Sequence, residues 1–169
     1  MYAECKQYLI QQLKAAGLKS NPYTSEKALE KSLESHVGAV LFESESILRN
    51  GSKKFYKDQE GAQKKRRRVF DRAIAFTVLL GDYTDEAVEL MFEQLLHNLD
   101  SGIYINGNFV SIEVEGSDWV DKDDSILKAK VAVQVKINFL GGIYKDTDFT
   151  KLTELAIKSV ERKKPTDGN

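Results

Sequence analysis

Apolar residues in two parts of the chain recur at the spacing of an amphipathic helix. Near the start, the predicted helix has an apolar face formed by Tyr2, Cys5, Leu9, Ile10 and Leu13. Gly17 follows its last apolar turn, where a helix stop is expected. Thr84 can cap the second helix, whose stripe consists of Val88, Met91, Phe92, Leu95, Leu96 and Leu99.

Elsewhere the pattern changes to the alternation that is typical of β-strands. Strands are predicted at residues 37–48, 53–57, 69–80, 109–114 and 127–140. In the first of these, apolar residues give way to polar ones, so the strand is expected to leave the core towards its end. The Asn50-Gly51 turn signal separates it from the short strand that follows, which we expect to be its partner.

The order of elements predicts an α+β fold. We expect an antiparallel or mixed sheet of about four to five strands with helices packed on one face. The chain reads as one domain over 1–169, with a core at about 1–146, a C-terminal helix at 147–162 and a flexible tail at 163–169. Within the core, the central helix is expected to pack on the sheet through Met91, Leu95, Phe76 and Val135.

Composition narrows the function classes. The chain has 169 residues, one cysteine and a formal net charge of −1. A single thiol cannot form an internal disulfide, and a neutral molecule has no overall attraction for nucleic acid or an anionic membrane. The first residues do not resemble a signal peptide, and no apolar run approaches the length of a membrane span. We therefore expect a protein of the cytoplasm, or of a particle assembled there.

The sharpest charge feature is a basic run at residues 64–68. The run consists of Lys64, Lys65, Arg66, Arg67 and Arg68. One interpretation is phosphate contact, although no aromatic residue interleaves the run to support base stacking. The other is a solvated loop that protects a strand end, or one that meets an acidic loop of a neighbouring subunit.

A candidate acidic partner lies at residues 115–125, which are predicted to form a loop around Trp119. Its interaction residues are Asp118, Asp121, Asp123 and Asp124, with Glu113 and Glu115 nearby. Separate basic and acidic surfaces on a nearly neutral chain can join head to tail, and such contacts repeated around an axis close a ring.

Catalytic patterns are sparse. Two carboxylate pairs, Glu43 with Glu45 and Glu113 with Glu115, could each share a strand face and hold a divalent cation. A nuclease site would also need a lysine two residues after the second carboxylate, and neither pair has one. His36 and His97 read as surface or capping residues. Gly141-Gly142 is best explained by a turn or a close backbone contact.

Residues 1–146 resemble phage tail-terminator or tail-completion proteins, the minor tail proteins of siphophages and their relatives in myophages and phage-like elements. The resemblance rests on the N-terminal helix, the strands at 39–42 and 69–80, the helix at 85–99 and the ending VAVQVKINFLGGIY at 131–144. The expected helix after Asp146 departs from the family pattern.

The resemblance implies a non-enzymatic protein without cofactor or metal. It implies a hexameric ring that caps the tail tube, stops its polymerisation and presents a surface to head-completion or sheath proteins, with DNA only as passing cargo. The virion tail would then be its location. Two other hypotheses remain, namely a nucleic-acid-binding module that uses the basic run and a metal-dependent nuclease that uses a carboxylate pair.

Overall fold

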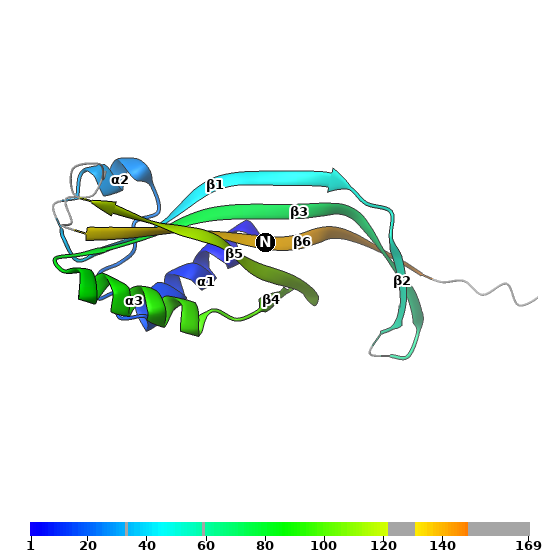
Figure 1. The fold of residues 1–169 in the computed structure, drawn as a ribbon. Helices are drawn as coiled ribbons and strands as arrows, with labels where there is room; N and C mark the ends of the chain where they lie inside the picture. The colour runs from blue at the N-terminus through cyan, green and yellow to red at the C-terminus, as the bar shows by residue number, and fades with distance from the viewer. Residues whose placement is uncertain (33, 59, 122–130, 149–169) are drawn as a thin grey trace, which may run out of the picture.

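The computed structural model describes residues 1–32, 34–58, 60–121 and 131–148, which form a six-stranded antiparallel sheet with helices (Figure 1). The helices are α1 (Tyr2–Ala15), α2 (Glu26–Glu30) and α3 (Asp85–Asn98). The strands are β1 (Val37–Arg49), β2 (Lys53–Lys57), β3 (Gln63–Asp82), β4 (Gly102–Ile105), β5 (Asn108–Asp121) and β6 (Val131–Asp148). The predicted α+β class is confirmed, and the sheet has one strand more than the upper expectation.

Two long strands, β3 and β6, form the centre of the sheet. The strand order is β1-β3-β6-β5-β4, and β2 also pairs with β3. The prediction that β2 pairs with β1 is therefore wrong. Both strands follow the same edge of β3, β1 along residues 70–81 and β2 along residues 63–67. The Asn50-Gly51 turn carries the chain from one strand to the other, and Asn50 Oδ1 accepts a hydrogen bond from the Ser52 amide at 2.8 Å.

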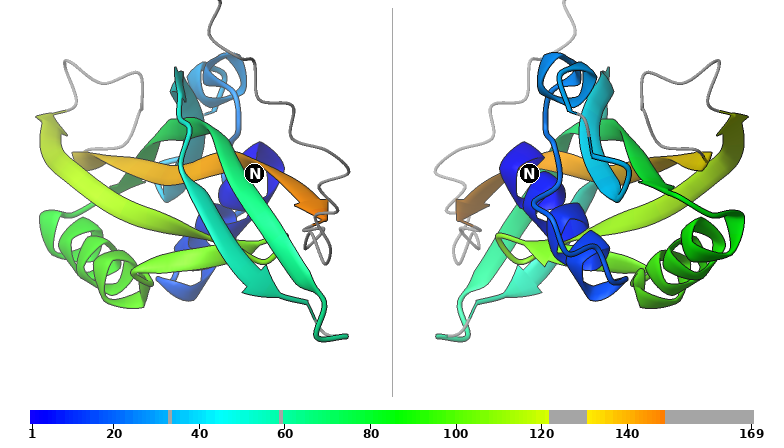
Figure 2. Two further views of the ribbon diagram at one scale, coloured as in Figure 1. Left: turned by 90° about the vertical axis from the view of Figure 1, so that its right-hand side faces the viewer. Right: turned by 90° about the vertical axis from the view of Figure 1, so that its left-hand side faces the viewer.

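The main core lies between the sheet and the two longer helices, α1 and α3. Figures 1 and 2 show both helices on one side of the sheet. Met91 and Leu95 of α3 are buried together with Phe76 of β3 and Val135 of β6, as predicted. The predicted cap is also confirmed, because Thr84 Oγ1 accepts a hydrogen bond from the Ala87 amide.

The opposite face of the sheet has a smaller apolar cluster under α2. Leu29 of α2 packs there with Val37, Ala39 and Leu41 of β1 and with Ala132 of β6. The expectation that helices cover only one face is therefore wrong at this end of the sheet. The reason is that Val37, Ala39 and Leu41 alternate with Val40, so both faces of this part of β1 are apolar. Beyond Leu41 every residue of β1 is exposed, as predicted.

Two predicted loops are strands. The basic run belongs to β3, which begins at Gln63, and residues 115–121 continue β5 rather than forming an acidic loop. Strand pairing with β2 and β6 outweighs the polar character of these sequences. Strand β4 was not predicted. The helix expected at 147–162 lies outside the described residues except at its start, where Asp148 is the last residue of β6.

Gly141 and Gly142 lie within β6, so the turn considered for them is wrong and the close contact is right. A Cβ atom on Gly142 would lie 2.6 Å from Arg68 Nε and 3.0 Å from the Phe70 carbonyl oxygen. A Cβ atom on Gly141 would lie 2.9 Å from the Met1 side chain. These two positions let β6 pass tightly between β3 and the start of α1.

Candidate functional site: a basic arm and an acidic end

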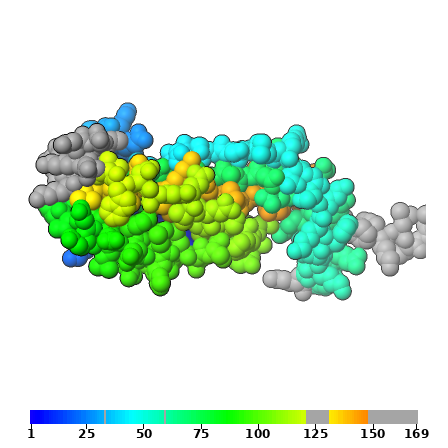
Figure 3. Space-filling model, in the orientation of Figure 1, coloured from blue at the N-terminus to red at the C-terminus, as the bar shows by residue number. Residues whose placement is uncertain are grey.

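The basic run forms part of a projecting three-stranded arm. The arm consists of β2, residues 63–68 of β3 and residues 144–148 of β6. Figure 3 shows β2 and its partner strand extending beyond the body that carries α3. Because side chains alternate along a strand, consecutive residues of the run point to opposite faces of the arm. We call the face that carries Lys64 and Arg66 the inner face, because Arg66 contacts Asn108 of β5 there. Lys65 and Arg67 lie on the opposite, outer face.

Arg66 holds the inner face of the arm together. Its guanidinium donates two hydrogen bonds to the Asp146 carboxylate, with Nε at 2.8 Å and Nη2 at 2.6 Å. Nη1 donates to Asn108 Oδ1 at 2.9 Å, and the guanidinium lies 4.9 Å from the Tyr56 ring centroid. The hydrogen bonds from Arg66 lower the pKa of Asp146, and the bonds to Asp146 raise the pKa of Arg66. Arg66 thus joins β2, β6 and the start of β5.

The neighbouring inner cations are also engaged within the molecule. Lys64 Nζ lies 3.8 Å from Asp58 at the tip of the arm. Arg68, beside a bulge in the pairing of β3 with β6, lies 2.7 Å from Asp71 and donates a 2.5 Å hydrogen bond to the Gly141 carbonyl oxygen. Three of the five basic side chains of the run therefore form contacts within the molecule.

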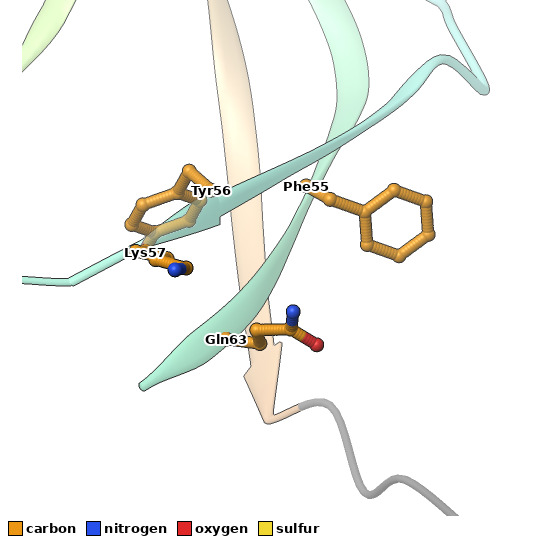
Figure 4. Close-up of a pocket in the computed structure, with 4 residues that line it drawn as sticks. All are labelled: Phe55, Tyr56, Lys57 and Gln63. Atoms are coloured by element: carbon orange, nitrogen blue, oxygen red, sulfur yellow. The ribbon is translucent and has the colours of Figure 1, made fainter. Parts of the chain in front are cut away.

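The outer face of the arm is different, because it gathers cations that form no ion pair with another described residue. Strand register places five of them together: Lys53, Lys57, Lys65, Arg67 and Lys145. Phe55 lies among them, opposite Lys65, and is 62% exposed. Figure 4 shows Phe55 and Tyr56 extending to opposite sides of β2, beside a pocket of about 290 Å³. The run does have an aromatic neighbour, supplied by β2.

Acidic side chains concentrate at the other end of the molecule. Asp118 is exposed on β5, and Asp121 ends that strand, while Asp123 and Asp124 lie outside the described residues. Helix α3 adds an exposed acidic surface made of Asp85, Glu86, Glu89 and Glu93. Figure 1 places α3 and the end of β5 at the left and the arm at the right. The structure therefore separates the basic run from Asp118 and Asp121 of β5.

The shared face predicted by strand alternation is wrong for Glu43 with Glu45 and right for Glu113 with Glu115. A bulge at Glu43 puts Glu43 and Glu45 in different surroundings, because Glu45 contacts Arg72 whereas Glu43 accepts from Thr77 Oγ1 at 3.0 Å. A second bulge lies at Glu115, but this carboxylate bonds Asn138 and Lys136, and Asn138 is the partner of Glu113, so Glu113 and Glu115 share a face as predicted. No group of three or more metal-binding side chains is found in the described residues.

A lysine instead joins one member of each carboxylate pair. Lys136 Nζ on β6 lies 3.0 Å from Glu43 on β1 and 3.1 Å from Glu115 on β5. The hydrogen bond to Glu43 is the main cause of a raised Lys136 pKa, and hydrogen bonds from Asn138 and Lys136 lower the Glu115 pKa. No local sequence pattern predicts this triad, because its members come from three strands.

The remaining reactive groups have structural surroundings. His36 Nδ1 is 2.7 Å from Asp82, while its Nε2 accepts a hydrogen bond from the Lys19 amide. The Nε2 acceptor role leaves the proton on Nδ1, so the ring donates to Asp82. Cys5 lies on the buried face of α1, and burial raises the pKa of its thiol to about 12. His97 is exposed on the last turn of α3.

A scan against models of protein families and a search of curated proteins both gave no match. Among the described residues, no helix has the length and apolar character needed to cross a membrane.

Sequence reasoning missed three arm residues of β2, Lys53, Phe55 and Lys57, and one of β6, Lys145. Pairing a Lys-Lys-Phe-Tyr-Lys segment with the basic run across the turn at Gly61 could have found the first three. Lys145 could not have been found in this way, because its contact with the arm is long-range.

Proposed function

We propose that this chain is a non-enzymatic structural protein that joins copies of itself head to tail into a closed ring. The observation that carries the proposal is the separation of charge along the molecule. A basic arm projects at one end, and exposed acids of α3 and β5 lie at the other, on a chain of net charge −1. Opposite charges on different surfaces of one molecule favour heterologous contacts between copies.

The resemblance of residues 1–146 to tail-terminator proteins suggests a role for this ring. In the proposed role, a ring of six copies caps the tail tube of a phage or phage-like particle and stops tube polymerisation. Its partners are then the tube protein on one side and head-completion or sheath proteins on the other. The ring belongs to a virion tail assembled in the bacterial cytoplasm, and DNA passes through it only as cargo.

The test is the mass of the full chain in solution. We expect sedimentation velocity at low salt to show a discrete species of six chain masses, and negative-stain images of that species to show rings. Dissociation with rising salt is expected, because exposed charge contacts are screened. A chain that remains monomeric from micromolar to millimolar concentration at low salt would overturn the proposal.

A second candidate function is nucleic-acid binding, favoured by one specific observation. Phe55 lies exposed among five cations on the outer face of the arm, and such a surface can contact phosphates while stacking a base. Fluorescence anisotropy with labelled single-stranded DNA tests it. Under this alternative, binding would weaken steeply with salt and would be lost when Lys65 and Arg67 are both replaced by serine.

A further inference from the structure

Helix α3 borders an apolar groove whose acidic edge is opposite in charge to the outer face of the arm. A groove of about 470 Å³ lies between the end of α1 and α3. Its apolar lining is formed by Ala15, Ala16, Gly17, Ala87, Leu90 and Met91. Leu90 is 60% exposed, so its side chain forms a solvent-facing apolar part of the groove.

Acidic side chains border this groove on the α3 side. Glu86 lies four residues before Leu90 and Glu93 three residues after it, so both lie next to Leu90 on the helix surface. Asp82 also lines the groove, together with its hydrogen-bond partner His36. Lys14 and Lys19 lie on the α1 side, so the negative charge is confined to α3 and Asp82.

The outer face of the arm presents the complementary arrangement. Phe55 is an exposed apolar side chain with cations on its own strand and on the strand beside it. Lys53 and Lys57 are its neighbours two residues away, and Lys65 is directly opposite. An aromatic anchor that enters an apolar groove, surrounded by opposite charges, is the arrangement found at energetically dominant points of protein interfaces.

We propose that Phe55 of one copy inserts into the α1–α3 groove of a second copy, with the outer-face cations of the arm meeting Glu86 and Glu93. This inference rests on the proposed ring and names its interface. The arm and the groove lie at opposite ends of the molecule, so a copy that gives its arm to one neighbour still offers its groove to another. Such a contact is heterologous, as a ring requires.

Exchange of charge between the two surfaces is the decisive experiment. The arm variant carries Lys65→Glu and Arg67→Glu, and the groove variant carries Glu86→Lys and Glu93→Lys. Each alone is expected to remain monomeric under conditions where the unmodified chain assembles. An equimolar mixture is expected to assemble again, because each kind of copy then meets a neighbour of opposite charge. Failure of the mixture to assemble would overturn the proposed interface.

Two controls give the result its specificity. A β5 variant, Glu113→Lys with Asp118→Lys, changes the same number of charges outside the groove and is expected to assemble normally. Assembly lost in this variant but retained in the groove variant would assign the arm to the β5 end instead. A Phe55→Ala variant is expected to weaken self-association about tenfold or more. An unchanged association constant would mean that the arm has no apolar anchor.

Disulfide trapping gives an independent readout. In a mixture of Phe55→Cys and Leu90→Cys chains, mild oxidation is expected to yield a covalent dimer. A mixture of Phe55→Cys with Tyr104→Cys is the control, because Tyr104 is exposed at a distance from the groove, on β4. Cys5 is buried and does not compete. Equal cross-linking in both mixtures would contradict the interface.

The measurements separate failure of this interface from failure of the ring itself. If the unmodified chain is monomeric, the proposed ring fails. If it forms a ring that the arm and groove variants leave intact, only this interface fails. Tight binding of single-stranded DNA by the groove variant, with loss of binding in the arm variant, would assign the outer face to nucleic acid instead.

Discussion

Two parts of strand β3, its buried middle and its N-terminal end, differ in how the sequence relates to the surface. From Ile74 to Phe76 the strand is buried between α1, α3 and the neighbouring strands. From residue 63 to residue 68 the same strand carries mostly basic side chains and has a helix on neither face in the described structure. Apolar burial stabilises the first region, and backbone pairing with side-chain ion pairs maintains the second. The body can therefore specify the fold while the arm remains available for contacts between molecules.

The largest expected effect lies in the body. Leu95 is fully buried against the sheet, so Leu95→Ala should lower the free energy of unfolding by about 2–5 kcal/mol through lost contacts and a cavity. For a domain of this size that is a large share of total stability. Chemical denaturation followed by circular dichroism measures it. Leu96→Ala on the same helix is the control, because Leu96 is 39% exposed and should cost much less.

A smaller and local effect is expected at the base of the arm. Arg66→Met removes the bonds to Asp146 and Asn108 while keeping much of the apolar stem. We expect the amides of β2 to exchange hydrogen faster, by an amount equivalent to about 1 kcal/mol, because the contacts are partly exposed. The rate of amide hydrogen exchange in the buried part of β3 should not change. Equal acceleration in both regions would show that the arm and the body unfold as one unit.

The same ion pair predicts a response to acid. The folded pKa of Asp146 lies below its ordinary value of 3.8, chiefly because of the hydrogen bonds from Arg66. Its stabilising contribution is therefore complete above the unfolded pKa and is lost as pH falls through the lowered folded pKa. An NMR titration of the Asp146 carboxyl group should give a midpoint below 3.8, and Arg66→Met should move that midpoint upwards. A midpoint unaffected by the substitution would contradict the assigned cause.

The smallest effect on stability is expected for Phe55 on β2 of the arm. Phe55→Ala should change the free energy of unfolding by no more than about 0.5 kcal/mol, because the ring is mostly solvent-exposed in the single chain. Thermal melts of the monomer at high salt would measure this without assembly. Loss of several kcal/mol would mean that Phe55 belongs to the core of the arm and is not a contact residue.

The body was largely predictable from the sequence because its signals are local. The stripe through Met91 and Leu95 identifies a helix, and Thr84 identifies its start, without knowledge of any distant residue. The change from apolar to polar residues in β1 likewise predicted where burial ends. Two features of this region were not predicted. Strand β4 is only four residues long, and α2 packs on the face of the sheet opposite α1 and α3.

The arm and the triad around Lys136 were not predictable by the same means. Arg66 lies 80 residues from Asp146, and only the pairing of β3 with β6 brings them together. The bulge at Glu43 places Glu43 and Glu45 on opposite faces of β1, whereas the alternation rule assumes that no bulge occurs. Pairing partners and bulges are set by the whole sheet, so a local pattern does not contain them.

The bulges at Glu43 and Glu115 have a consequence for how the molecule behaves at high concentration. Beyond Leu41 on one side of the sheet and beyond Ile112 on the other, β1 and β5 have no second partner strand among the described residues. Each of these open edges is kinked at a glutamate that is tied back to Lys136. Bent, negatively charged edges resist the strand-by-strand stacking that leads to amyloid. Concentrated protein should therefore yield assemblies that salt can dissolve, and not fibrils that bind thioflavin.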